Sequence, residues 1–428
     1  MGVALCGTMM MVEHTIPMRP QRVRPGITRR EAVRLGLAGI SAPLYGQSRT
    51  VSVAAIVTEY RFWSHADVIV GRLLGGYSMN GVHRPPSSRV VSLFTDQVPA
   101  NDMSRDLAAR HGFKIYPTIR EALTLGKGRL AVDAVVFVGE HGDYPTNELG
   151  QKQYPRYELF TQILDVYESS GKAVPTFFDK HLSYSWQKAK SMYDRAAKLK
   201  VPWLAGSSVP LTVRDPILAY PLGTPLQEAL MIGYGGLDAY GFHTLECLQA
   251  MVERRAGGES GVRRVEFVGG EHVWRWRDSD AGAWTKPLLE AALARCPKRP
   301  PGAVEQSARA PALFLINYND GLRAVCYMLQ GAVSNWAFAG RRKNSGEIES
   351  CRFGLSQATR PLPHFDGLVY CIEQLFLTAK PMYPVERTLL STGMLAFVFE
   401  SRRAGTAVET PELKITYRAP EPSFFQRS

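Results

Sequence analysis

The stretch VPTFFDKHLSYSW (residues 174–186) joins an apolar run directly to three ionisable side chains. The apolar residues predict a buried strand over 172–178, and Asp179, Lys180 and His181 follow it without a break. In a doubly wound parallel sheet, ligands bind beyond the carboxyl ends of the strands. Ionisable groups at this strand end therefore indicate both a sheet of that kind and a ligand site at its edge.

The sequence around this stretch alternates short apolar runs with helical patterns. Alternating strands and helices imply an α/β domain with a doubly wound parallel sheet, which we assign to residues 48–210. The predicted strands are 51–57, 89–94, 131–139, 172–178 and 201–207, and the predicted helices are 66–77, 103–111, 119–125, 157–171 and 185–200.

The pattern changes after about residue 215. Long segments alternate polar and apolar residues, as in VEFVGGEHVWRW (265–276) and LFLINYNDGLRAVCYML (313–329). This alternation predicts an α+β second domain, residues 211–414, with an open antiparallel sheet that has one covered face. The predicted strands are 263–276, 312–331, 334–342 and 350–356, the predicted helices are 365–377 and 384–402, and 415–428 are expected to form a tail.

Length and composition are those of an ordinary globular protein. A chain of 428 residues with 45% hydrophobic and 21% charged residues predicts two folded domains. Of the net charge of +12, five units lie in residues 1–50, so the rest of the chain is only mildly basic. It has no zinc finger, basic helix or RNA-binding signature, so we expect no nucleic-acid partner. The six cysteines form no CxxC pair, which favours buried thiols over a metal cage or a disulfide framework, although one bridge remains an alternative.

Residues 1–47 are expected to form a leader. TRREAVR (28–34) contains a pair of arginines, and a weakly apolar stretch, LGLAGISAPLY (35–45), follows it. This arrangement resembles a twin-arginine export signal and is too short to span a bilayer as a mature helix. We therefore expect export of a folded protein to the periplasm, without a stable membrane span. The alternative is an amphipathic N-terminal helix on a cytoplasmic protein.

Two segments carry residues suited to catalysis. Lys180 can hydrogen-bond to a hydroxyl or carbonyl oxygen and offset charge that develops on it. In GYGGLDAYGFHTLECLQAMVERR (233–255), glycines surround Asp238 and Tyr240, and His243 stands near the start of a helix. His243 is suited to general acid/base catalysis because imidazole titrates near neutral pH. The alternatives are a solvated strand-end lysine and a capping or packing histidine.

Together these segments resemble the glucose–fructose oxidoreductase / inositol dehydrogenase / MocA family. Asp179-Lys180-His181 stands where the family carries Glu-Lys-Pro. The string from Asp238 to His243 is similar to the family's Asp-x-Gly-x-His, with Asp238 one place early and Tyr240 in its slot. Segments 133–145, 185–216 and 384–411 also resemble the family in order and spacing, so the likeness covers about residues 51–412.

The resemblance implies a fold and an activity. The family pairs an N-terminal Rossmann domain with a C-terminal domain built on an open antiparallel sheet. Its members are oxidoreductases that transfer hydride between NAD or NADP and a sugar, cyclitol or related polyol. In this chain Lys180 would polarise the substrate hydroxyl and His243 would accept its proton, with Asp238 and Tyr240 orienting His243. A homo-oligomer, dimer or tetramer, is also implied.

The first strand departs from the family where the dinucleotide should bind. The family has Gly-x-Gly-x-x-Gly there, because glycines let the backbone approach the pyrophosphate. Here VAAIVTEYRFWSHADV (53–68) has no glycine, and Val57, Glu59 and Phe62 fall in the glycine slots. Glu59 would repel phosphates and Arg61 could compensate. Asp96, which ends the second strand, could hold the adenosine ribose and would favour NAD, although a strand-end Asp is often only a turn residue.

The loop EHGDYPTNELGQKQYPRYELF (140–160) is rich in polar and aromatic groups. We expect Glu140 and His141 to lie with Asp179 at the edge of the sheet, near the cofactor. A packed polar connector is the alternative. Glu140, His141, Asp179 and His181 could also bind a metal ion, but no spacing fixes their geometry.

Two hypotheses of function remain open from the sequence. The first is an NAD(P)-dependent oxidoreductase acting on a sugar, cyclitol or polyol. The second is a family member that has lost dinucleotide binding and binds a sugar-like ligand or a partner protein in the cleft. The missing glycines favour the second hypothesis, whereas the retained Lys180 and His243, with the export signal, favour the first.

Overall fold

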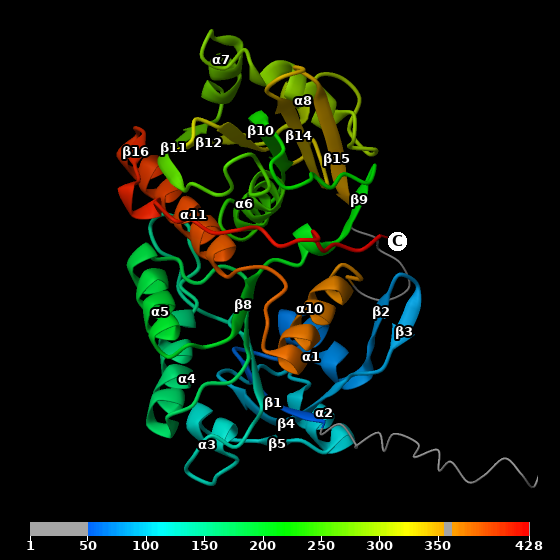
Figure 1. Ribbon diagram of the computed structural model, residues 1–428, viewed down its shortest axis with the longest axis vertical. Helices are drawn as coiled ribbons and strands as arrows, with labels where there is room; N and C mark the ends of the chain where they lie inside the picture. Colours follow the sequence, from blue (N-terminus) through cyan, green and yellow to red (C-terminus); the bar gives the residue numbers. More distant parts are fainter. Residues whose placement is uncertain (1–49, 355–361, 428) are drawn as a thin grey trace, which may run out of the picture. The chain divides into compact units, whose positions relative to one another are not determined.

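The computed structural model describes residues 50–354 and 362–427. These residues belong to one compact unit, and the predicted leader, residues 1–47, lies outside the described residues. The described part of this unit contains two large sheets, one of six strands and one of eight, and a small sheet of two strands (Figure 1). Within the described ranges, no helix is long and apolar enough to cross a membrane.

The first sheet is parallel and has the strand order β5-β4-β1-β6-β7-β8. β1 lies between β4 and β6 and is parallel to both, so the strand order reverses at this point. This is the doubly wound, Rossmann-like sheet that the sequence predicted, and its ligand crevice is expected at the carboxyl ends beside β1. The strands are β1 (Val51–Val57), β4 (Ser88–Thr95), β5 (Lys114–Ile115), β6 (Ala134–Val138), β7 (Thr176–Asp179) and β8 (Trp203–Gly206).

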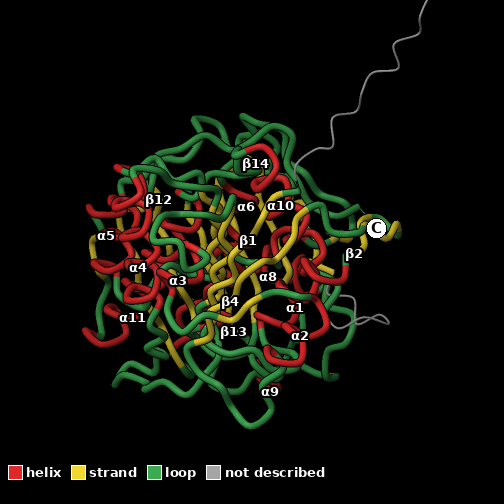
Figure 2. The backbone as a smooth tube through the Cα atoms, turned by 90° about the horizontal axis from the view of Figure 1, so that it is seen from below, coloured by secondary structure: helices red, strands yellow, loops and turns green. Residues whose placement is uncertain are grey.

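Helices cover both faces of this sheet. Because side chains alternate along a strand, Val53 and Ala55 face one side of β1 and Ala54 and Ile56 face the other. Figure 2 shows α3 and α4 on one side of the strands and α1 on the other. The helices are α1 (His65–Gly75), α2 (Ser104–His111), α3 (Ile119–Thr124), α4 (Arg156–Ser170) and α5 (Trp186–Lys198), and a hairpin of β2 (Tyr77–Met79) and β3 (Val82–Arg84) follows α1.

One helix of the C-terminal half belongs to this first sheet. α10 (Phe365–Thr378) packs beside α1, and its buried residues join those of β1 in one hydrophobic cluster. In Figure 1 it lies next to α1. The helix itself was predicted from the sequence, but its position against the N-terminal sheet was not.

The second sheet has the order β16-β11-β12-β13-β10-β14-β15-β9. Its neighbouring strands are antiparallel, as predicted, except that β10 and β13 run parallel. The sheet is therefore mixed. Its strands are β9 (Val213–Asp215), β10 (Leu226–Gly233), β11 (Val262–Gly269), β12 (Ala312–Tyr318), β13 (Arg323–Met328), β14 (Trp336–Arg342), β15 (Ile348–Gly354) and β16 (Val408–Glu409).

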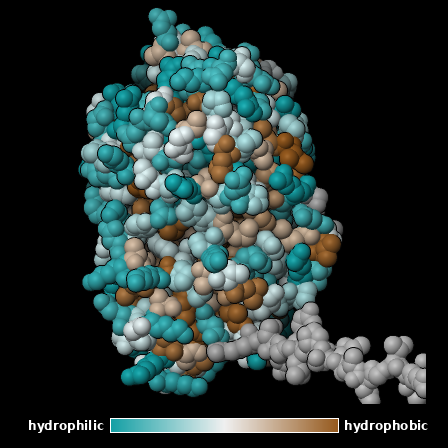
Figure 3. Space-filling view, viewed as in Figure 1, coloured by the Kyte–Doolittle hydropathy of each residue, from teal (hydrophilic) through white to brown (hydrophobic). Residues whose placement is uncertain are grey.

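Helices also lie on both faces of the second sheet. α6 (Ala239–Val252) and α11 (Glu386–Ala404) pack on the face toward the first sheet. On the other face, α7 (His272–Asp278) and α8 (Thr285–Leu293) bury Leu230 and Ile232 of β10. The prediction of a single covered face is therefore wrong, because Val273, Leu288 and their neighbours supply a second apolar layer. Figure 3 shows mostly hydrophilic residues at the end where α7 lies.

Two further segments differ from expectation. The alternating segment 263–276 is not one strand, because β11 ends at Gly269 and α7 begins at His272. Gly270 has φ 62°, a left-handed conformation that glycine adopts without strain and that breaks the strand. The segment expected to form a tail packs on the folded unit instead: the guanidinium carbon of Arg214 lies 4.2 Å from the centroid of the Phe425 ring. The short elements η1 (Val209–Leu211), α9 (Val304–Ser307) and η2 (Pro411–Leu413) complete the described fold.

Candidate active site

The ends of β6, β7 and β8 meet the start of α6 around a cavity of about 370 Å³. Lys180 follows β7, Glu140 and His141 follow β6, and His243 lies in the first turns of α6. The edge of the sheet and the second domain thus both contribute to its wall. The cavity is lined by Trp63, His65, Glu140, His141, Tyr154, Lys180, Ser208, Val209, Tyr234, Ala239, Tyr240, His243, Trp336, Leu362, His364 and Phe365.

Lys180 and His243 are in direct contact. The Lys180 Nζ lies 2.7 Å from the His243 Nε2, and both residues are buried. Lys180 has φ 68°, and its backbone N–H donates to the Gly206 carbonyl at 3.1 Å. A lysine in the left-handed region costs about 1–2 kcal/mol, so the fold holds this side chain at a definite position despite strain. The two residues that the sequence predicted to act together are therefore neighbours.

Ser207 fixes the other side of the His243 ring. Its Oγ lies 2.6 Å from His243 Nδ1 and accepts a hydrogen bond from the Val209 N–H at 3.0 Å. Because the Lys180 ammonium donates to Nε2, the hydrogen of the neutral ring is assigned to Nδ1, where it is donated to Ser207. Burial, and then the positive charge of Lys180, hold the pKa of His243 well below its usual range. His243 is therefore a neutral imidazole with a lone pair on Nε2.

A buried carboxylate stands beside this pair. Glu140 forms an ion pair with Arg156, and its Oε1 lies 3.6 Å from Lys180 Nζ. Burial alone would raise the pKa of Glu140, but Lys180 and Arg156 together hold it well below its usual range. Arg156, only 1% exposed, also donates to the Gly139 carbonyl at 2.9 Å and lies 2.8 Å from His181 Nε2. Glu140 thus supplies a fixed negative charge next to the Lys180 ammonium.

Asp238 and Tyr240 occupy different positions around His243. The Tyr240 ring lies edge-on to His243 at 6.0 Å and stacks on Trp336 at 5.5 Å. Asp238 accepts a hydrogen bond from the Lys152 N–H at 3.0 Å and lies 3.9 Å from His181. Burial raises the pKa of Asp238. Tyr240 therefore packs against His243, whereas the ring is oriented by the hydrogen bond that His243 Nδ1–H donates to Ser207 Oγ.

A second histidine, which the sequence did not single out, faces the same cavity. His65 is the first residue of α1, and its Nδ1 lies 2.6 Å from the Asp179 carboxylate. The backbone N–H of His65 donates to His141 Nδ1 at 3.3 Å. Burial, and then the neighbouring His65, lower the pKa of His141 to about 3. His65 follows the loop after β1 in sequence, and this position at a strand end was the only signal that could have identified it.

The groups expected to hold a dinucleotide have partners within the chain. Glu59 pairs with Arg61 at 2.6 Å, and Asp96 accepts a hydrogen bond from the Tyr144 hydroxyl at 2.6 Å. Glu140, His141 and Asp179 are engaged by Arg156, His65 N–H and His65 Nδ1 as described above. At the start of α1, the Asp67 N–H donates to Ser64 Oγ, which caps the helix.

The turn between β1 and α1 therefore does not fit a pyrophosphate in the described conformation. Phosphate binding at a helix start needs free backbone N–H groups and close approach of the ligand. Here two of those donors serve the side chains of His141 and Ser64. Phe62 and Trp63, 61% and 54% exposed, stack on each other at 5.6 Å in the same turn.

The alternative of a metal site finds no support. Within residues 50–354 and 362–427, no group of three or more His, Cys, Asp or Glu residues is arranged to hold a metal ion. Asp179 is paired with His65, while Glu140 and His181 are both held by Arg156.

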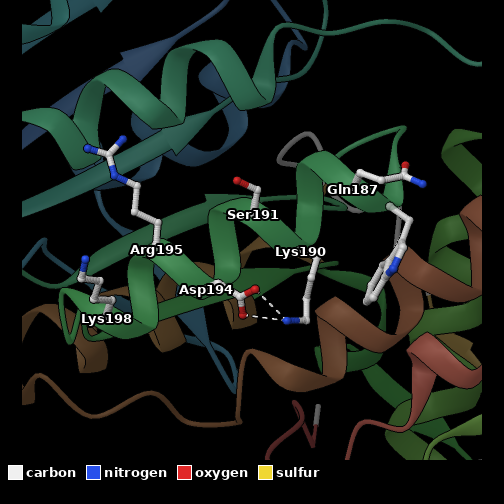
Figure 4. Close-up of a pocket in the computed structure, with 7 residues that line it drawn as sticks. Gln187, Lys190, Ser191, Asp194, Arg195 and Lys198 are labelled. Atoms are coloured by element: carbon white, nitrogen blue, oxygen red, sulfur yellow. Dashed lines mark hydrogen bonds and ion pairs between the residues drawn. The ribbon is translucent and has the colours of Figure 1, made fainter.

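Another hollow, of about 590 Å³, lies on the surface of α5. Figure 4 shows its side chains along a single helix, with Lys190 and Asp194 joined as an ion pair at 2.7 Å. It shares no lining residue with the cavity around Lys180 and His243.

Comparison with known proteins identifies the fold. The sequence matches no family model and no curated protein sequence. GenD2 from gentamicin A biosynthesis, solved in complex with NAD, is similar with a TM-score of 0.51 and 15% identity, over 84% of this chain and 96% of that one. A scyllo-inositol dehydrogenase from Lactobacillus casei gives a TM-score of 0.52 with 10% identity, over 84% and 98%.

A third structure with this fold is the super-repressor mutant of Gal80p from Saccharomyces cerevisiae. Its TM-score is 0.51 with 11% identity, over 86% of this chain and 100% of that one. At such identities the likeness shows the fold alone. It confirms the two-domain fold that the resemblance implied, a Rossmann-like parallel sheet followed by a domain built on a second, mixed sheet.

Proposed function

We propose that the chain is an oxidoreductase of the glucose–fructose oxidoreductase / inositol dehydrogenase / MocA type, acting on a hydroxyl group of a sugar, cyclitol or related polyol. The observation that carries this proposal is the 2.7 Å contact between Lys180 and His243 at the cavity. The scyllo-inositol dehydrogenase among the similar folds supports this substrate class, and the NAD complex of GenD2 supports NAD or NADP as cofactor. Binding of a dinucleotide would require the β1–α1 turn to leave its described conformation, because two of its backbone donors are engaged there.

The described residues account for the proton half of such a reaction. A substrate hydroxyl placed between the two side chains would replace their direct contact and donate its proton to His243 Nε2. The Lys180 ammonium would stabilise the alkoxide that forms. Ser207 keeps His243 in the tautomer that can accept the proton, and Glu140 balances the charge of Lys180.

A second candidate is favoured by the paired groups of the β1–α1 turn. With Glu59, Asp96 and the start of α1 already engaged, the chain could bind a sugar-like ligand or a partner protein without any dinucleotide. Such a protein would retain affinity for polyols but would show no nucleotide-dependent turnover.

The experiment that separates the candidates is a titration of the protein, purified without residues 1–47, with NAD, NADH, NADP and NADPH. Tryptophan fluorescence and melting temperature report binding, and the purified sample is first denatured and scanned for released nucleotide. Nucleotide binding followed by turnover in a polyol screen supports the oxidoreductase. Polyol binding with no bound or released nucleotide supports the second candidate and rejects the first.

Two variants test the role of Lys180 in the same screen. Lys180→Met keeps the length of the side chain but removes its charge, so turnover should fall by about 100-fold or more while the fold is retained. Lys190→Met, on the surface of α5, is the matched control and should behave like the wild type. Full turnover in Lys180→Met would reject the assigned role.

We also propose that the leader directs twin-arginine export to the periplasm, which rests on the arginine pair at 29–30 and the apolar stretch after it. Replacement of both arginines by lysine should keep the protein in the cytoplasmic fraction. An unchanged distribution between the fractions would reject export by this route.

A further inference from the structure

The cavity contains a second pair of side chains with the geometry of an acid/base catalyst. His65, from the first turn of α1, lines the same cavity as Lys180 and His243. Its Nδ1 lies 2.6 Å from Asp179 Oδ2, and Asp179 is itself buried at the end of β7. Neither residue takes part in the proton transfer proposed for His243, and the Asp179 carboxylate that was expected near the cofactor is bound to His65 instead.

The hydrogen bond to Asp179 determines which nitrogen of His65 can react. A carboxylate accepts hydrogen bonds only, so the proton of the neutral imidazole resides on Nδ1 and the lone pair on Nε2. The carboxylate also stabilises the imidazolium that forms when Nε2 takes a proton, as in other pairs of histidine and carboxylate. The His65 side chain is 13% exposed and lines the cavity, so a ligand bound there can reach it.

The surrounding contacts hold the ring in place. Phe365 lies edge-on to His65 at 5.0 Å, and His141 packs against it at 5.2 Å. The His65 backbone is fixed as well, because its N–H donates to His141 Nδ1. Precise orientation of this kind is what a proton-transfer group requires.

We propose that His65, oriented by Asp179, is a second general base of the cavity, and that the chain catalyses enolisation of hydroxyketones related to sugars and cyclitols without a dinucleotide. His65 Nε2 removes the proton from the carbon next to the ketone. The electron pair of that C–H bond forms the carbon–carbon double bond, and the carbonyl π pair moves to oxygen, where the Lys180 ammonium stabilises it. Return of the proton from His65 regenerates the ketone, so no oxidant or reductant is needed.

The ligand class of this inference rests on the proposed function, but the reaction does not. Hydride transfer requires a bound nucleotide, whereas enolisation requires only the ketone, His65 and Lys180. Exchange of the proton next to a ketone, without any reduction of a nucleotide, would therefore support enolisation and reject the oxidoreductase proposal.

The test is hydrogen–deuterium exchange, followed by ¹H NMR in D₂O, with 2-keto-myo-inositol and 1,3-dihydroxyacetone as probes and no added nucleotide. Binding of each ketone is measured separately by tryptophan fluorescence. His65→Gln and Asp179→Asn are compared with His83→Gln, which changes an exposed imidazole on β3. Melting temperatures check that each variant is folded.

We expect the wild type and His83→Gln to exchange at least one ketone faster than buffer. His65→Gln should lose this rate by on the order of 100-fold while still binding the ketone, and Asp179→Asn should lose less. Exchange in His65→Gln at the wild-type rate would overturn the proposal. So would a wild type that binds a ketone without exchanging it, or that binds neither probe.

Discussion

Glu246 is the buried carboxyl group whose titration should be visible in the stability of the whole protein. It lies on α6 one turn after His243 and is fully buried, and its Oε1 has no hydrogen-bond partner among the described residues. Its Oε2 is 3.5 Å from the Ser207 N–H. Burial, only partly offset by Arg387, raises the pKa of Glu246 from 4.5 to about 7.

The sign of the effect follows from proton linkage. Because the folded-state pKa is raised, the folded protein binds more protons than the unfolded chain between pH 4.5 and about 7. Stability from this group is therefore fully present below pH 4.5 and is lost as pH rises to about 7. At about 1.4 kcal/mol for each pH unit, the loss amounts to about 3 kcal/mol.

Glu246→Gln removes the titration but keeps the shape of the side chain. We expect the variant to be close to the wild type in stability at pH 5 and more stable than it by up to about 3 kcal/mol at pH 8. The assay is urea unfolding, followed by tryptophan fluorescence at half-unit steps from pH 5 to 8.5. The control is Glu148→Gln, an exposed carboxyl group, which should give a curve parallel to the wild type.

The informative quantity is the difference in unfolding free energy between Glu246→Gln and the wild type, since every other titrating group contributes equally to both. A difference that stays constant across this pH range would refute the reasoning. It would mean that Glu246 is solvated or ion-paired in the folded protein.

Three further predictions follow from the buried contacts. Arg156→Met leaves the Glu140 carboxylate buried without its partner, so the free energy of unfolding measured in urea should fall by about 3–5 kcal/mol. The control, Arg195→Met at a surface ion pair, should change it by less than about 1 kcal/mol. Ser207→Ala should release the Nδ1 proton of His243 from its hydrogen bond, which ¹⁵N NMR of the imidazole detects as a changed tautomer equilibrium, while an unchanged spectrum would contradict the assigned bond. The described cysteines are all free and buried: Cys247, Cys296, Cys326, Cys351 and Cys371. A thiol reagent should therefore label the protein lacking residues 1–47 only after unfolding. Rapid labelling of the native protein would contradict their burial.

The sequence predicted the parts of this structure that depend on local patterns. Apolar runs and helical spacing located five of the six strands of the first sheet and helices such as α4 and α11, because each pattern reflects burial of one element. The sixth strand, β5, has only two residues and gives no such pattern. The predicted strand 263–276 is correct only as far as Gly269, because its second part forms α7 from His272. The predicted strand 312–331 is two strands, β12 and β13, joined by a turn. The covering of the second sheet by α7 and α8 depends on tertiary packing, which periodicity does not report.

The residues of the candidate site also fall into those that a local sequence pattern identified and those that only long-range contacts reveal. Lys180 and His243 were identified because each stands in a recognisable motif, and the structure brings them to 2.7 Å. Ser207 and His65 carry no motif, and their importance appears only through contacts with residues far along the chain, as in the bond of His65 to Asp179. The partner of Asp96, Tyr144, is likewise 48 residues away. Long-range hydrogen bonds of this kind could not be derived from one sequence.

The loss of the glycines has an energetic consequence beyond the steric one. A dinucleotide held by the groups that the sequence predicted to bind it would have to replace several of their contacts, among them Glu59–Arg61, Asp96–Tyr144 and the bond from His65 N–H to His141. Each hydrogen bond contributes about 1 kcal/mol net, so three of them weaken binding by on the order of 100-fold before any clash with Phe62 is considered. None of these contacts involves Lys180 or His243. Lys180 and His243 can therefore stay in contact whether or not the β1–α1 turn binds a dinucleotide. For this reason the proposed proton transfer and the proposed hydride transfer have to be tested separately.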